Sequence, residues 1–128
     1  MTNFTQQPAF ANLSKLAEDI KKTHMRDWFD AQPERADTMQ AQACGLFIDY
    51  SKNRVNEEAL AQLFTLAKAQ GVDTHRKAMF DGDTINNTEK RAVLHTALRN
   101  FSGKPVMVDG EDVMPEVLAT LEKIEAFT

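Results

Sequence analysis

Apolar residues spaced three and four positions apart recur along this chain, and that spacing restricts the fold to short amphipathic helices. Over residues 8–22 it predicts a helix whose apolar stripe is Leu13, Leu16, Ala17 and Ile20. The same spacing predicts a short helix around Met25–Phe29, a longer helix from Asn56 to about Gln70, and a last helix from Pro115 to the chain end. The chain is therefore predicted to be mainly helical.

Proline and glycine mark where the predicted helices stop. Pro33 restricts the residue before it and should end the second helix. Gly71 lies at the usual C′ position after the longer helix. A shorter helix should follow over residues 73–80, and residues 34–42 are predicted as a short helix or a loop.

Two short apolar runs, Leu46–Tyr50 and Val106–Val108, are predicted as strands because a turn signal follows each of them. Two isolated strands are marginally stable alone. We therefore expect them to pair with one another, antiparallel, under the helices. The predicted fold class is mainly α with a small two-stranded β element (α+β).

Residues 89–99 are predicted as a capped helix that carries positive charge beside an apolar stripe. The basic side chains follow at i, i+4 and i+8, at Arg91, His95 and Arg99. This stripe could attract an anion such as the phosphate of a phosphosugar. The alternative is that these side chains contact carbonyls and carboxylates of neighbouring elements or domains. The structural interpretation is favoured, because nothing nearby in sequence completes a catalytic constellation.

Length and charge limit the classes of function. A chain of 128 residues is one domain by size, and its polar first residues, 1–7, are expected to be disordered. The net charge of −4 argues against nucleic-acid binding through an overall positive field. No apolar run approaches the ~20 residues needed to span a membrane, so no membrane partner is expected.

Metal and cofactor motifs are not apparent in the sequence. The three histidines are far apart and form no H-x-x-x-H pair, and phosphate-cradling glycine loops do not occur. We therefore expect no metal and no cofactor. The single cysteine, Cys44, suits a reducing cytoplasm and is expected to be a small buried hydrophobe.

Three ordered blocks resemble the glucose-6-phosphate isomerase family. Residues 85–100, INNTEKRAVLHTALRN, resemble its "IN-x-TE-x-RAVLH-x-ALRN" segment. Residues 46–53, LFIDYSKN, resemble its "DYSKN" strand and turn, and residues 108–117, VDGEDVMPEV, resemble its "VDG-x-DVMPEV" segment. Three blocks in the family's order are more specific than one short motif. The first 45 residues match loosely, and because the family's enzymes are several times longer, the chain resembles their amino-terminal segment.

The resemblance implies an aldose-ketose isomerase that interconverts glucose 6-phosphate and fructose 6-phosphate through an enediol-type intermediate, in glycolysis and gluconeogenesis. It implies a cytoplasmic homodimer that needs no metal. None of the family's catalytic or phosphate-binding motifs matches a position here, so no catalytic residue is assigned in this chain. The chain is expected to be a catalytically inert scaffold. Its partners would be the remainder of the same enzyme, which forms a larger α/β sugar-isomerase fold and binds the phosphosugar.

An alternative is a free-standing helical protein-interaction module without enzymatic activity. The amphipathic helices permit it, and the chain's end at Thr128 nominally supports it. Against it, the last predicted helix reaches the end without a glycine or proline stop, as expected of a cut inside a longer chain. Reading the coding sequence beyond Thr128 would discriminate between the two.

Overall fold

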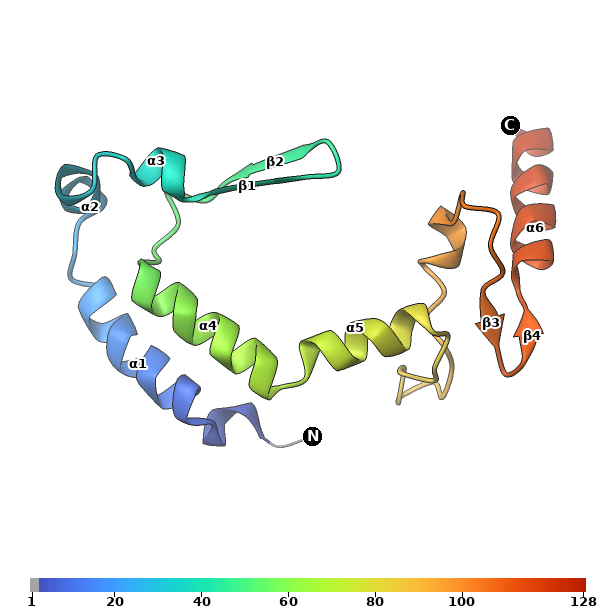
Figure 1. Cartoon of the computed structure of the whole chain (residues 1–128), viewed down its shortest axis with the longest axis horizontal. Helices are drawn as coiled ribbons and strands as arrows, with labels where there is room; N and C mark the ends of the chain where they lie inside the picture. The colour runs from blue at the N-terminus through green and yellow to red at the C-terminus, as the bar shows by residue number, and fades with distance from the viewer. Residues whose placement is uncertain (1–2) are drawn as a thin grey trace. The chain divides into compact units, whose positions relative to one another are not determined.

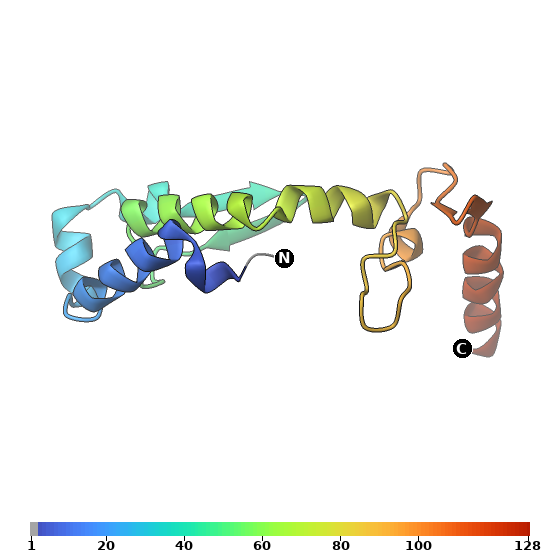
Figure 2. The same ribbon diagram turned by 90° about the horizontal axis from the view of Figure 1, so that it is seen from below.

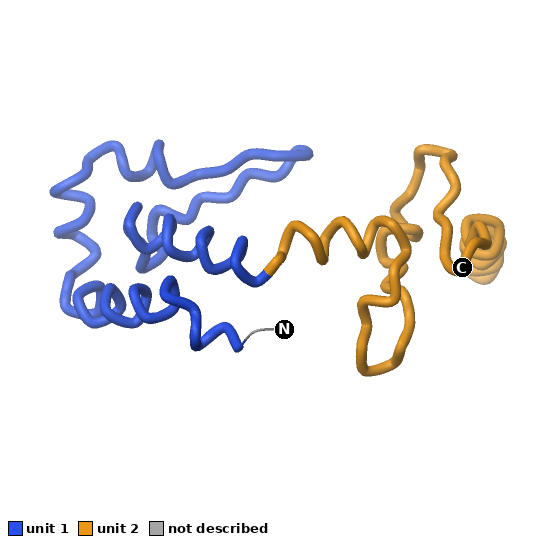
Figure 3. Tube along the Cα trace, turned by 60° about the horizontal axis from the view of Figure 1, so that its bottom comes forward, with its two compact units in different colours: residues 1–70 blue, residues 71–128 orange. Residues whose placement is uncertain are grey.

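The computed structural model describes residues 3–128 and divides the chain into two compact units, Met1–Gln70 and Gly71–Thr128 (Figures 1 and 3). Within the described residues, each unit combines helices with one two-stranded antiparallel sheet. The predicted fold class, mainly α with a small β element, is confirmed. The sequence predicts a single segment over residues 1–128. In the structure, most contacts between residues fall within one or the other of the two units.

From residue 3 onward, unit 1 holds a 3₁₀ helix, four α-helices and a β-hairpin: η1 (Phe4–Gln6), α1 (Pro8–Ile20), α2 (Met25–Ala31), α3 (Arg35–Thr38), β1 (Gln40–Ala43), β2 (Leu46–Asp49) and α4 (Glu57–Ala69). Residues 1–7 are the segment for which the sequence predicts disorder. Within it, Asn3 caps η1 by accepting from the Thr5 N–H at 3.1 Å. Residues 1 and 2 lie outside the described residues.

Helices α1 and α4 lie side by side and antiparallel within unit 1 (Figures 1 and 2). The predicted stripe of α1 faces α4, because its four apolar residues line one cavity together with Ala59 and Leu63. Asn12 of α1 donates a side-chain hydrogen bond to Gln62 of α4 at 3.3 Å. Ala59 is buried, which is consistent with a close approach of the two helices.

Asn56 caps α4 as the sequence predicts. Its side-chain oxygen accepts from the Ala59 N–H at 2.8 Å, which satisfies one of the free donors of the first turn. We expect Asn56→Ala to lower the free energy of unfolding by about 1 kcal/mol, and Asn56→Asp to retain most of it. Urea titration followed by circular dichroism measures both, and equal stabilities of the two variants would show that the cap contributes nothing.

The hairpin corrects the predicted pairing of strands. β2 pairs with β1, a segment predicted as helix or loop, and its expected partner at Val106–Val108 lies in unit 2. Cys44 (φ 51°) and Gly45 (φ 76°) form the two-residue turn in the left-handed conformation that matches the twist of a hairpin. Cys44 is exposed at this turn, so the prediction that it is buried is wrong.

Arg35 is a charged residue that is only 1% exposed, and it holds the base of the hairpin. It donates three hydrogen bonds, of 2.7 to 3.1 Å, to carbonyl oxygens of the chain after β2, those of Ser51, Asn53 and Val55. Its guanidinium carbon also lies 4.9 Å and 5.9 Å from the centres of two aromatic rings of α2, those of Trp28 and Phe29. The charge is thus buried with hydrogen-bond partners, which is the condition for tolerating it.

Unit 2 holds two α-helices, a 3₁₀ helix and a short hairpin: α5 (Val72–Phe80), η2 (Ala97–Arg99), β3 (Met107–Val108), β4 (Glu111–Asp112) and α6 (Met114–Phe127). Buried Ala97 and Met114 anchor η2 and the start of α6. Among residues 3–128, no helix is both long and apolar enough to cross a bilayer.

The predicted helix over residues 89–99 is wrong, because only Ala97–Arg99 is helical and it is a 3₁₀ turn. Asn86 explains the failure: its side chain accepts from the Glu89 N–H at 3.1 Å, and its backbone pairs with Arg91 in a β-bridge. Lys90 between them has φ 52°, a left-handed value that an α-helix cannot contain. The segment is therefore a tight loop followed by extended chain.

Candidate functional site

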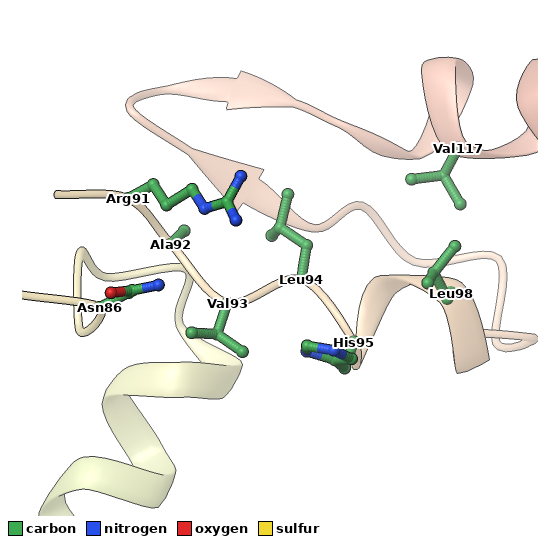
Figure 4. Close-up of a pocket in the computed structure, with 8 residues that line it drawn as sticks. All are labelled: Asn86, Arg91, Ala92, Val93, Leu94, His95, Leu98 and Val117. Carbon is green, nitrogen blue, oxygen red and sulfur yellow. The ribbon is translucent and has the colours of Figure 1, made fainter. Parts of the chain in front are cut away.

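Unit 2 contains a cavity of about 370 Å³ in the region to which the sequence assigned positive charge (Figure 4). The loop after α5, the extended chain before η2, η2 itself and α6 contribute its walls. The lining residues are Asn86, Arg91, Ala92, Val93, Leu94, His95, Leu98 and Val117.

Local backbone geometry places these side chains. The bridge between Asn86 and Arg91 closes the loop through backbone hydrogen bonds of 3.1 and 3.3 Å, so both residues stand at the same side of the cavity. On the other side, Leu98 of η2 and Val117 of α6 point toward one another (Figure 4). Ala97, 1% exposed, fixes η2 in that position.

The three predicted basic residues do not form one stripe. Arg91 and His95 line the cavity together, whereas Arg99 lines a different cavity of about 270 Å³ that also contains Lys104. Arg99 turns back on its own segment and donates to the His95 carbonyl oxygen at 2.9 Å. The predicted spacing depended on a helix that does not form, so the predicted arrangement of Arg91, His95 and Arg99 is wrong.

The charges around the cavity are poorly suited to binding an anion. The Arg91 guanidinium pairs with the Glu89 carboxylate, which neutralises its charge locally. The imidazole of His95 is exposed to water, where electrostatic interactions are screened and weak. Within residues 3–128, no group of three His, Cys, Asp or Glu side chains is positioned to hold a metal ion.

The remaining wall of the cavity is aliphatic, contributed by Ala92, Val93, Leu94, Leu98 and Val117. A sugar phosphate needs several converging donors for its hydroxyls and phosphate. The cavity offers one paired guanidinium, one imidazole and one amide, so its chemistry fits an apolar side chain better than a phosphosugar.

Sequence reasoning found Arg91 and His95 through their charge, but it missed Asn86 and Val117 as members of the cavity. Asn86 carried a usable signal, because an Asn two to three residues before a predicted helix often forms a side-chain turn of its own. Val117 carried none, because its place in the wall depends on how α6 packs against η2.

Comparison with known proteins identifies one family. The family model described as phosphoglucose isomerase matches residues 49–128. The chain is 64% identical over 128 residues to the glucose-6-phosphate isomerase of Alteromonas mediterranea, and 57% identical over 127 residues to that of Pseudoalteromonas atlantica. It is 46% identical over 127 residues to glucose-6-phosphate isomerase 1 of Neisseria gonorrhoeae.

These matches cover 99 to 100% of the chain but only 23% of each relative. The similarity therefore includes the first 45 residues, for which the sequence motifs gave only a loose match. It extends through both units and through the cavity lined by Arg91 and His95.

Proposed function

The chain belongs to the phosphoglucose isomerase family, and we propose that it forms the amino-terminal, supporting part of a glucose-6-phosphate isomerase. The observation that carries the proposal is the 64% identity along the whole chain to a relative of which the chain spans 23%. In this proposal the complete enzyme is a cytoplasmic homodimer of glycolysis and gluconeogenesis, and it interconverts glucose 6-phosphate and fructose 6-phosphate through an enediol-type intermediate.

The supporting role is favoured by how little of the chain is buried. Among the described residues the buried apolar side chains are five: Ala9, Met39, Ala59, Ala97 and Met114. Large apolar side chains are exposed in both units, on the β1–β2 hairpin, on α4 and on α6. Exposed apolar surface of this extent is typical of a face that another body covers. The catalytically inert chain would then be completed by the remainder of the enzyme.

A hybrid enzyme tests this proposal. The chain replaces the segment that it matches in the Alteromonas mediterranea isomerase, and the same enzyme without that segment is the control. We expect the hybrid to convert fructose 6-phosphate at a rate comparable to that of the Alteromonas enzyme, and the control to be inactive or insoluble. A folded but inactive hybrid would contradict the proposal, as would full activity of the control.

Within the same proposal, Arg91 and His95 support an inter-domain contact and do not bind substrate. In the hybrid we expect Arg91→Gln and His95→Gln to change kcat and KM by less than about twofold, because neither side chain belongs to a set of converging phosphate donors. Arg76→Gln is the matched control, since Arg76 is an exposed arginine of α5 paired with Asp73. A rise in KM of about tenfold for Arg91→Gln alone would assign that residue to the substrate site.

A further inference from the structure

The β1–β2 hairpin has one apolar face that none of the described residues of unit 1 covers. In the register of the hairpin, Ala41 pairs with Ile48 and Ala43 pairs with Leu46. Cross-strand partners share a face of the sheet, and alternate residues lie on opposite faces. The second face carries Gln40, Gln42, Phe47 and Asp49.

Both strands are exposed along their whole length. Every residue from Gln40 to Asp49 is exposed, and the side chains that dominate the apolar face, Leu46 and Ile48, are 68% and 58% exposed. A two-stranded hairpin is marginally stable in water unless one face packs on something else. The hairpin extends beyond α3 as an arm of unit 1 (Figure 1).

The base of this arm is held firmly although its faces are free. Arg35 fixes the chain that follows β2 through its three hydrogen bonds to backbone carbonyls. Met39, which precedes β1, is 3% exposed, and its carbonyl oxygen accepts from the Tyr50 N–H at 3.0 Å. Because the arm is held at its base, its apolar face points in a defined direction. Covering that face therefore costs little conformational entropy.

Two occupants could cover the face, a second copy of this chain or the remainder of the isomerase. The apolar surface is not confined to the hairpin: Phe64 of α4 is 59% exposed, and in unit 2 Leu118 and Ile124 of α6 are 51% and 56% exposed. A second copy would add 128 residues with the same exposed apolar side chains still to be covered. In the relatives, the polypeptide outside the matched segment is more than three times as long as that segment. This length is enough to cover the exposed apolar side chains of both units.

We infer that the Ala41, Ala43, Leu46 and Ile48 face of the hairpin is an intramolecular docking surface for the remainder of the isomerase. The inference rests on the proposed function and adds to it the face through which unit 1 attaches. Phe47 and the polar side chains around it face away from the docked body.

Hydroxyl-radical footprinting with mass spectrometry tests the inference on unmodified side chains. The chain alone and the hybrid isomerase are oxidised in parallel. We expect oxidation of Leu46 and Ile48 to fall about fivefold or more in the hybrid, since their exposed fractions of 68% and 58% should drop to those of core residues. Phe47, 61% exposed on the opposite face, is the internal control and should change by less than about twofold.

The outcomes separate this inference from the proposed function. An active hybrid in which Leu46 and Ile48 remain fully oxidised overturns the inference and leaves the proposed function standing. Concentration-dependent protection of Leu46 and Ile48 in the chain alone, with dimers in light scattering, assigns the face to a second copy and also overturns it. An inactive hybrid contradicts the proposed function, and in that hybrid protection of Leu46 and Ile48 but not Phe47 would still support the docking face.

Discussion

Arg35→Met should lower the free energy of unfolding of unit 1 by about 3–5 kcal/mol, because three hydrogen bonds from one charged donor are lost together. Arg35 is 1% exposed, and removal of its guanidinium leaves three carbonyl oxygens without the donor that they accept from. Methionine keeps an unbranched apolar stem in place of the aliphatic part of arginine, so the loss reports mainly the hydrogen bonds and ring contacts of the guanidinium. Urea titration followed by the fluorescence of Trp28, the only tryptophan, reports on this cluster directly.

Two variants control for general effects of charge and length. Arg26→Met removes an exposed arginine of neighbouring α2 and should change stability by less than about 0.5 kcal/mol. Arg35→Lys keeps the charge but loses the planar fork that reaches several carbonyls, so its stability should lie between those of the wild type and Arg35→Met. If Arg26→Met and Arg35→Met were equally stable, the role given to Arg35 at the hairpin base would be wrong.

Gly82→Ala should destabilise unit 2 by about 3 kcal/mol or more, since two independent penalties act at this position. Gly82 has φ +81°, and a Cβ built on it would lie 2.0 Å from the backbone oxygen of Met107 and 3.1 Å from its carbonyl carbon. Because the clashing atoms are backbone, relief requires a shift of the backbone at residue 82 or at β3. The residue also ends α5 in a Schellman-type turn, in which the Asp83 N–H donates to the Ala78 carbonyl at 3.0 Å.

Gly103→Ala is the matched control for backbone conformation alone. Gly103 has φ +71°, close to that of Gly82, but a Cβ at this position would have no neighbouring atom within 4 Å. Gly103→Ala should therefore lower the free energy of unfolding by only about 1 kcal/mol, the cost of placing alanine in the left-handed conformation. Circular dichroism during urea unfolding measures both variants, and equal losses for the two would mean that the close approach to Met107 is not rigid.

Features determined by a few neighbouring residues were predictable from the sequence. The Asn56 cap, the helix end before Pro33 and the left-handed Gly71 all depend on local backbone chemistry, and the structure has each of them. The stripe of α1 was likewise predictable, because one helical face must be apolar to pack on α4.

Features that depend on distant contacts or competing local bonds were not predictable in the same way. β1 reads Gln-Ala-Gln-Ala, a pattern with little strand preference, and it becomes a strand through its pairing with β2. Around Leu94 and Leu98 the apolar spacing imitates a helix, but the side-chain turn of Asn86 and the left-handed Lys90 exclude one. The predicted arrangement of the basic residues at the cavity depended on this helix. The sequence therefore identified Arg91 and His95 but not how they are arranged.

In the proposed function, this chain supports an active site whose reacting groups lie on other polypeptide. The most direct test measures isomerase turnover of the purified 128-residue chain beside that of the hybrid enzyme, with fructose 6-phosphate as substrate. We expect no turnover above background for the chain alone and clear turnover for the hybrid. Turnover by the chain alone would mean that the catalytic groups lie within these 128 residues, and a supporting role would then be wrong.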